Sequence, residues 1–233
     1  MKNWRHYRRL IFNKATLSRV LSEIELEHIR DSLFCNSSIS SVLLAGAGKG
    51  SQGSEYVFLD AFDSKVTSVF VDINSLRSPD LVADLMCLWP FKNGNFDLVV
   101  STWVLEHIAN PEIFLREANR VLQSKGKFVC SVPFLQRKHG SPYDYYRFTD
   151  KALYKLLVSA GFKHIQIKPV GGTPFVCCVS LVWPIIRLPF LGVIIYLLAR
   201  ILDGVLRVTA EKMRKASSLF TSYPINYIIV AIK

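Results

Sequence analysis

A glycine-rich segment, GAGKG at residues 46–50, has the clearest chemical meaning in this sequence. It follows a short apolar run at 42–45 with the composition of a buried strand, and Asp72 ends the next apolar run. Glycines at alternate positions let the backbone turn sharply and approach a ligand that a Cβ would block. A carboxylate at the next strand's end can accept hydrogen bonds from two ribose hydroxyls. Together these features predict a site for a nucleoside cofactor.

The spacing of the glycines excludes two familiar nucleotide motifs. Position 51 is Ser, so the pattern is GxGxG and not the GxGxxG of dinucleotide-binding folds. Lys49 is followed by Gly50 and not by Ser or Thr, so the segment is not a P-loop. The alternative is a structural turn that binds nothing, and the surrounding sequence must decide.

A second group of chemically capable residues lies in HGSPYDYYRFTD, at 139–150. Its aromatic rings can line a pocket, and Arg147 can hold an anionic group. The alternative is that the rings only pack this loop onto the rest of the fold.

These groups need elements that position them, and the sequence alternates strand-like and helical segments. An amphipathic helix is expected over 16–34, Pro111 opens another helix, and Thr149 caps a third that Gly161 ends. Alternating strands and helices predict a parallel sheet covered on both faces, with ligands at the carboxyl ends of its strands. The expected strands are 41–45, 66–71, 96–101, 127–133, 163–168 and 226–232.

Charge and composition bound the class of protein. The chain has 233 residues, half of them hydrophobic, and a net charge of +11 that divides into +6 over 1–20, zero over 21–170 and +5 over 171–233. A neutral central domain does not favour nucleic acid, whereas basic ends beside apolar sequence fit an anionic membrane surface. The five cysteines form no CxxC pair, and the sequence shows no His cluster at metal spacing. We therefore expect no metal site and no disulfide framework, as suits a reducing cytosol.

In this context the sequence resembles a class I S-adenosylmethionine-dependent methyltransferase of the type 11 kind. The resemblance implies an α/β, Rossmann-like, doubly wound seven-stranded sheet whose last strand is antiparallel, with S-adenosyl-L-methionine as cofactor. It rests on VLLAGAGKG (42–50), VFVDI (69–73), VADLMCLWPF (82–91) and the run from strand to strand at 96–133.

The resemblance also implies roles for individual residues. The glycines would let the backbone pass the methionine and ribose, Asp72 would hold the ribose hydroxyls, and Asp84 would accept from the adenine amine. Leu85 would lie beside the ring, and Ser101 and Thr102 would border the sulfonium. The implied cofactor-binding set is Ala45, Gly46, Gly48, Gly50, Asp72, Ile73, Asp84, Leu85, Ser101 and Thr102.

One position departs from the family pattern. Leu44 stands two residues before the first glycine, where the family usually carries an acidic residue that holds the cofactor's ammonium group. Loss of one charged hydrogen bond would weaken binding by about 1–3 kcal/mol.

For an enzyme of this family, the loop at 139–150 is the expected acceptor region. Methyl transfer depends mostly on in-line positioning, but an oxygen acceptor benefits from a general base. His139 and His107 are the candidate bases, because imidazole is available in its neutral form near pH 7. The candidate catalytic set is His139, His107, Tyr143, Tyr146 and Arg147, with the tyrosines orienting the acceptor.

Before the last strand lies a very apolar insertion, residues 175–202. Its uninterrupted pieces, 175–186 and 188–199, are too short for two spans of about 20 residues. A monotopic hairpin or an interfacial helix pair, broken at the prolines, is expected; extra core or a homodimer face is the alternative. The expected parts are 1–35, a basic segment with an amphipathic helix; 36–170 with 223–233, the methyltransferase domain; and 171–222, the membrane-associating insertion.

The leading functional hypothesis is O-methylation of a lipid, a quinone or a lipid-linked glycan. The protein is then cytoplasmic, peripheral or monotopic on the inner face of the membrane. The alternatives are an RNA or protein methyltransferase and a non-catalytic scaffold with a cofactor fold.

Overall fold

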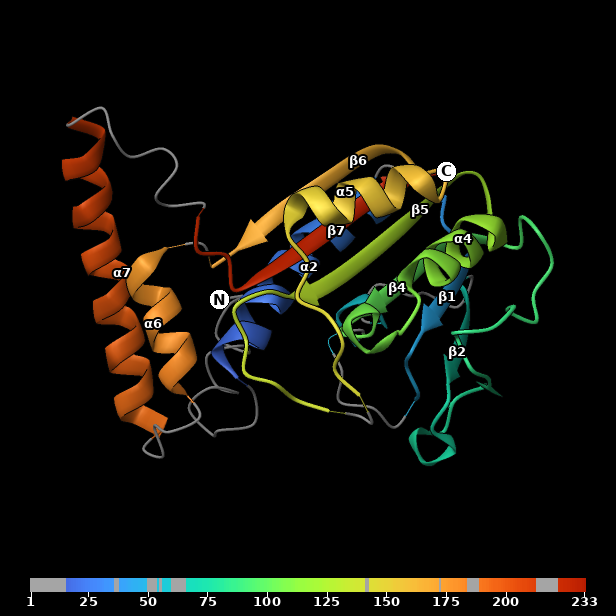
Figure 1. Cartoon of the computed structure of the whole chain (residues 1–233), viewed down its shortest axis with the longest axis horizontal. Coiled ribbons are helices and arrows are strands. Elements are labelled where there is room, and N and C mark those ends of the chain that lie inside the picture. Colours follow the sequence, from blue (N-terminus) through green and yellow to red (C-terminus); the bar gives the residue numbers. More distant parts are fainter. Residues whose placement is uncertain are drawn as a thin grey trace. The chain divides into compact units, whose positions relative to one another are not determined.

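Seven strands form one sheet in the order β3–β2–β1–β4–β5–β7–β6 (Figure 1). The structure is a computed structural model, and it describes residues 16–35, 38–49, 54, 56–59, 66–140, 143–171, 173–183, 189–212 and 222–233. Strands β1 to β5 pair in parallel, and the last strands are antiparallel, as the sequence predicted. The strands are β1 (Ser41–Ala45), β2 (Thr67–Asp72), β3 (Leu81–Val82), β4 (Phe96–Thr102), β5 (Leu122–Pro133), β6 (Lys163–Val170) and β7 (Asn226–Ile232).

Helices cover both faces of this sheet, and α4 and α5 lie side by side over one of them (Figure 1). Asn110 caps α4 by accepting from the Ile113 N–H at 3.3 Å, and Pro111 fills its first turn. Thr149 caps α5 in the same way, through the Ala152 N–H. The helices are α2 (Leu17–Cys35), α3 (Tyr56–Leu59), α4 (Pro111–Val121), α5 (Asp150–Ser159), α6 (Pro174–Val182) and α7 (Pro189–Lys212), with 3₁₀ helices η1 (Ser75–Arg77) and η2 (Leu105–His107).

The central strands are buried on both faces, which explains why the apolar runs located them correctly. Leu43 and Leu44 of β1 and Val99 of β4 are fully buried, as expected for parallel strands between layers of helices. Two expectations were wrong in extent. Strand β5 begins at Leu122 and not at 127, because its polar first residues carry no apolar pattern, and the two-residue β3 was not expected as a strand.

The chain divides into two compact units. One comprises Met1–Glu25, Phe134–Arg137 and Pro169–Tyr227; the other comprises Leu26–Pro133, Lys138–Lys168 and Ile228–Lys233. This grouping places the first part of α2 with the insertion, whereas the three-part division expected from the sequence stays a prediction. The basic segment at 1–15 lies outside the described residues.

In the first unit, α6 and α7 pack as a helix pair, and α7 begins at Pro189. The segment 184–188 between them lies outside the described residues. Asp203 of α7 ties them together, because its carboxylate accepts from the backbone N–H groups of Phe175 (3.1 Å) and Val176 (3.0 Å). It thus satisfies first-turn donors that the N-cap residue Thr173 leaves without a side-chain cap. The core of this unit contains Leu17, Val20, Val176, Val179, Trp183, Tyr196, Ala199 and Ile225.

Helix α7 buries one face and exposes the other, although both are apolar. Tyr196 and Ala199 are buried, while Ile194, Leu198 and Ile201 are each more than half exposed. Among the described residues, none of the helices combines the length and the apolar character needed to cross a membrane.

Candidate active site

Four strands bring the predicted site residues to one edge of the sheet. In the parallel pairs, Ala45 lies opposite Val71, and Thr102 lies opposite Ser131. The segments that follow β1, β2, β4 and β5 therefore leave the sheet at the same edge. This edge is where an open α/β sheet binds its ligands.

The glycine turn after β1 is tight, but its close neighbours belong to the chain itself. Gly46 has a φ of +83°, and its N–H donates to the Val71 carbonyl at 2.8 Å. A Cβ on Gly46 would lie 2.3 Å from a methyl of Val104, and one on Gly48 would lie 2.1 Å from the Arg77 carbonyl oxygen. A side chain would therefore clash at both positions, as expected. The atoms that it would meet belong to Val104 and Arg77, however, and not to a ligand. Gly50 lies outside the described residues.

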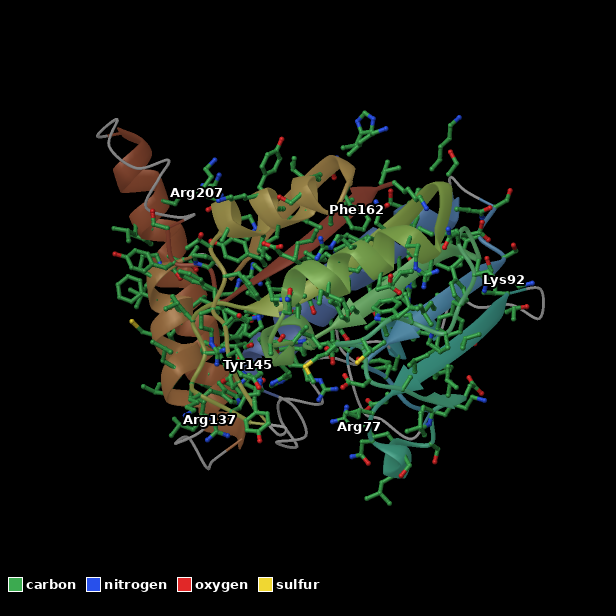
Figure 2. All side chains as sticks on the ribbon, turned by 45° about the vertical axis from the view of Figure 1, so that its right-hand side comes forward. Arg77, Lys92, Arg137, Tyr145, Phe162 and Arg207 are labelled. Atoms are coloured by element: carbon green, nitrogen blue, oxygen red, sulfur yellow. The ribbon has the colours of Figure 1, made fainter. Side chains whose placement is uncertain are left out.

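Asp72 ends β2 as predicted and is almost fully buried. Its carboxylate accepts from the Asn74 N–H at 2.8 Å and from Arg77 (labelled in Figure 2) at 3.2 Å. A carboxylate offers about four lone-pair sites, so these two bonds leave capacity for ribose hydroxyls. Ile73, beside it, is 58% exposed.

The predicted adenine segment forms a fixed turn after β3. Asp84 accepts from the Met86 N–H at 2.8 Å, and the Leu85 carbonyl accepts from the Trp89 indole at 3.2 Å. Strand β4 pairs with β1 and ends in Ser101 and Thr102, which are both buried. Among the described residues, the Ser101 hydroxyl has no hydrogen-bond partner, so this edge holds a polar group for which a ligand is a suitable partner.

A strained residue directs the chain out of β4. Trp103 has a φ of +59°, which is rare for a bulky side chain, and its N–H donates to the Ser131 carbonyl at 3.0 Å. The chain then enters η2, which carries Glu106 and His107 and leads to the capped start of α4. Strain of this kind concentrates at functional sites, because the surrounding structure must maintain it.

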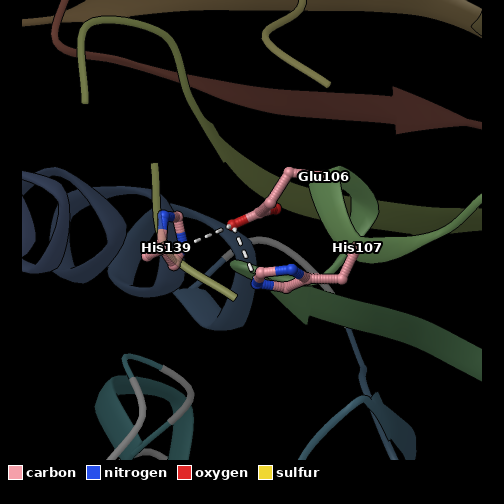
Figure 3. A group of neighbouring side chains, drawn as sticks. All are labelled: Glu106, His107 and His139. Atoms are coloured by element: carbon pink, nitrogen blue, oxygen red, sulfur yellow. Dashed lines mark ion pairs between the residues drawn. The ribbon is translucent and has the colours of Figure 1, made fainter. Parts of the chain in front are cut away.

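Three side chains meet at this point: Glu106 and His107 from η2, and His139 from the loop after β5 (Figure 3). Glu106 Oε1 lies 3.8 Å from His107 Nε2 and 3.7 Å from His139 Nε2. The two imidazole rings are edge-to-face, with centroids 5.1 Å apart. Glu106 is fully buried, and neither carboxylate oxygen accepts a hydrogen bond from any described residue.

The loop that carries His139 is anchored to η2 by its backbone. The N–H groups of Tyr145 (2.8 Å) and Tyr146 (3.3 Å) donate to the Glu106 carbonyl. The Tyr146 hydroxyl donates to the Ala109 carbonyl at 2.8 Å, and its ring stacks on Phe148. Tyr146 therefore packs the loop onto the fold, which was the alternative considered for its aromatic residues. Its role in orienting an acceptor stays a prediction. Tyr143 is 63% exposed.

Asp144 and Arg147 stiffen the same loop. The Arg147 guanidinium donates to both Asp144 carboxylate oxygens, at 2.5 and 2.7 Å, and this pairing holds the pKa of Asp144 well below its usual range. Asp144 also accepts from the His139 N–H at 2.8 Å. In this structure Arg147 holds Asp144, and its predicted contact with an anionic acceptor stays a prediction.

The lowered pKa of Asp144 predicts a pH-dependent stability. Its ionised form stabilises the fold fully above the unfolded pKa of about 3.9, and this contribution is lost as the pH falls toward the folded-state value. We expect Asp144→Asn to lower the free energy of unfolding by about 2 kcal/mol at neutral pH. Urea unfolding should show this difference shrinking below about pH 4. Asp150→Asn, at an exposed position, is the control, and a difference that stays constant into acid would contradict the prediction.

The structure thus unites His107 with His139 as candidate bases and adds a residue that sequence reasoning missed. Glu106 was not among the expected site residues. The sequence could have indicated Glu106, because it lies next to His107 in the segment between a strand and a helix. Its contact with His139 depends on the loop after β5 and cannot be read from spacing. We expected no metal site from the sequence, because the residues of the Glu106–His107–His139 group come from two separate segments and show no metal-ligand spacing.

Comparisons with known proteins agree with this geometry. A family model described as a methyltransferase domain matches residues 43–130. A methyltransferase from Archaeoglobus fulgidus, described as dependent on S-adenosylmethionine, has 17% identity and a TM-score of 0.58 over 92% of this chain and 94% of its own. No curated protein matches the chain.

Two further structures share the fold. Phosphoethanolamine N-methyltransferase 2 from Haemonchus contortus, in complex with S-adenosyl-L-methionine, has 15% identity and a TM-score of 0.53, over 88% of this chain and 52% of its own. The 1,6-didemethyltoxoflavin-N1-methyltransferase of Burkholderia thailandensis, with bound S-adenosylhomocysteine, has 16% identity and a TM-score of 0.51, over 89% and 76%.

The matched domain, the strand order and the glycine–aspartate edge define a class I methyltransferase fold. Residues 43–130 match a methyltransferase domain, and this match together with the fold supports an S-adenosylmethionine-dependent methyltransferase with S-adenosylmethionine as its cofactor, as the sequence predicted.

Proposed function

We propose that this enzyme methylates a hydroxyl oxygen of a lipid, a quinone or a lipid-linked glycan at the surface of an anionic membrane. The observation that carries the proposal is the Glu106–His107–His139 group at the ligand-binding edge of the sheet. A positioned base matters for an oxygen acceptor, because a neutral hydroxyl is a weak nucleophile.

The group can remove the acceptor's proton. Either imidazole Nε2 can accept it, and the Glu106 carboxylate, 3.7–3.8 Å away, would stabilise the imidazolium that forms. Burial of Glu106 strengthens this attraction, since the local dielectric is low.

The cofactor would be held at the neighbouring strand ends. Asp72 would accept from its ribose hydroxyls, Asp84 would face the adenine amine, and Ser101 would border the sulfonium. When bound, S-adenosylmethionine supplies an activated methyl group, which passes to the acceptor oxygen as the carbon–sulfur bond breaks and S-adenosylhomocysteine remains. The strand ends, for their part, orient cofactor and acceptor for in-line transfer.

The membrane part of the proposal rests on the exposed faces of α6 and α7. Half of the large hydrophobic side chains that are exposed among the described residues lie on these two helices. On α7, Ile194, Leu198, Ile201 and Val205 follow the spacing of a single helical stripe. Arg200 and Arg207 are also exposed on this helix, where they can meet lipid phosphates.

Substitution within this stripe tests the membrane proposal. We expect Ile194→Glu with Ile201→Glu to weaken binding to anionic vesicles at least about 100-fold, since burying each side chain contributes about 1.5–3 kcal/mol. Co-sedimentation with vesicles measures the effect. Leu88→Glu with Val158→Glu, at exposed sites in the other unit, is the matched control. A wild type that ignores vesicles but dimerises through this stripe would identify a homodimer face instead.

The acceptor is tested by product formation. With S-adenosylmethionine present, vesicles carrying a quinol or a lipid-linked sugar should yield S-adenosylhomocysteine in proportion to methylated oxygen. Turnover on RNA or protein, with none on hydroxyl acceptors, would replace the proposal with the alternative substrate class.

A further inference from the structure

We infer that Glu106, His107 and His139 form a binding site for a divalent transition-metal ion of the zinc type. The inference deepens the proposed function by giving the same group an ion in place of a free imidazole base, and it rests on that function only for the acceptor oxygen that the ion would bind. Ion binding itself is measurable without turnover.

The first argument is the placement of the three ligand atoms. One ligand atom from each of the three residues lies within 4.8 Å of the other two, and Glu106 Oε1 lies 3.8 Å from His107 Nε2 and 3.7 Å from His139 Nε2 (Figure 3). Ligands about 2.1 Å from a tetrahedral ion are about 3.4 Å apart. The carboxylate therefore needs to move only a few tenths of an ångström relative to each imidazole.

The second argument is the state of the Glu106 carboxylate. It is fully buried, and both of its oxygens lack a hydrogen bond from the described residues. A buried ionised carboxylate is costly unless a charge or hydrogen bonds compensate it. A divalent ion in contact with Oε1 supplies that charge. The nearby Arg147 is a poorer source, because its guanidinium is paired with Asp144.

The third argument is the orientation of both imidazoles. His107 Nδ1 lies 2.5 Å from the Tyr143 carbonyl oxygen, and His139 Nδ1 lies 3.5 Å from Asp144 Oδ2. Because a carbonyl oxygen only accepts, His107 Nδ1 carries the proton in this contact and its Nε2 keeps its lone pair, while the Asp144 carboxylate faces the Nδ1 side of His139. Metal-binding histidines characteristically donate their other N–H to a carbonyl or a carboxylate in this way. Both Nε2 atoms face the Glu106 carboxylate, where an ion would lie.

The donor set selects the ion. Two imidazole nitrogens and one carboxylate oxygen suit zinc and its neighbours, whereas magnesium and calcium prefer all-oxygen sites. Three protein ligands leave a coordination position open, as in catalytic zinc sites. An acceptor hydroxyl in that position would lose its proton more readily. Since both Nε2 atoms are then ligands, that proton passes to solvent and not to imidazole.

The test is a titration of the chelator-treated, full-length protein with Co²⁺, whose visible absorption reports coordination, followed by displacement with Zn²⁺. We expect one ion per chain and a raised Tm. We expect Glu106→Gln, His107→Asn and His139→Asn each to weaken binding more than tenfold. Asp144→Asn, which removes only the outer partner of His139, should weaken it about 10–100-fold. His164→Asn is the matched control, because His164 is exposed and asparagine tolerates its positive φ.

The outcomes separate the inference from the proposed function. The inference would be overturned if the three ligand variants bound the ion as tightly as the wild type does. It would also be overturned if a folded wild type bound no ion. Methylation of a hydroxyl acceptor at full rate after chelation would also overturn it and leave the general-base mechanism standing. Binding lost in the ligand variants, without methylation of any hydroxyl acceptor, would support the ion site and overturn the proposed function.

Discussion

Glu106→Gln is expected to lower the rate of methyl transfer about 10²–10⁴-fold, the usual contribution of a proton-transfer group. The substitution preserves shape but removes the charge that faces His107 and His139. The affinity for S-adenosylmethionine should not change, because the residues expected to hold it lie on β1, on β2, in the segment after β3 and at the end of β4. Initial rates of S-adenosylhomocysteine formation, with cofactor titrations, separate the two effects.

Glu112→Gln is the matched control for this variant. Glu112 is exposed in the first turn of α4, only six positions along the chain from Glu106. It should leave both rate and cofactor affinity unchanged. A Glu106→Gln enzyme with the wild-type rate would show that neither a base nor an ion at this group takes part in the reaction.

Asp72→Ala is expected to raise the Kd for S-adenosylmethionine about 100-fold, since a hydrogen bond to a charged group contributes about 1.5–3 kcal/mol. The carboxylate already accepts from Asn74 and Arg77, and its remaining lone pairs are those expected to meet the ribose. Calorimetric titration measures the change directly.

Two variants accompany Asp72→Ala. Asp72→Asn retains one acceptor oxygen and should bind with intermediate affinity. Asp150→Ala, at an exposed position at the start of α5, should bind as the wild type does. Wild-type affinity in Asp72→Ala would mean that the end of β2 does not hold the ribose.

The fold could be predicted largely from local patterns. Buried parallel strands are continuous apolar runs, so β1 and β4 were located almost to the residue. Helix α5 was predicted at both ends, because Thr149 and Gly161 have the chemistry that starts and stops a helix. Strand β3 was missed because its two residues carry no period.

The site was harder to predict, since its key contacts join segments far apart in sequence. The sequence indicated that His107 and His139 were capable of chemistry, but their shared contact with Glu106 depends on how the loop after β5 folds back onto η2. Likewise, Arg147 suggested an anion site, whereas its nearest carboxylate proved to be Asp144 in the same loop.

The roles of the glycines show the same limit. Their spacing indicated a tight backbone, but not what approaches it. Gly46 faces Val104 and Gly48 faces Arg77, so both glycines serve the packing of the turn. A pattern in one segment cannot reveal which other segment will lie against it.

The insertion contains two helices, and one of its prolines, Pro189, begins the second of them. This helix continues to Lys212, past the apolar piece expected to end at 199, because its later residues keep one apolar face. The sequence cannot show what covers the exposed apolar stripe on α7, because the covering surface is not part of the chain. That this surface is a membrane stays a proposal, which vesicle binding tests.

The most direct test of the central claim is a calorimetric titration of S-adenosylmethionine into the full-length wild-type protein in mild detergent. We predict saturable micromolar binding at one site per chain, despite Leu44 at the position where the family usually carries an acid. A well-folded protein that binds no S-adenosylmethionine would contradict the claim and leave a non-catalytic scaffold with a methyltransferase fold.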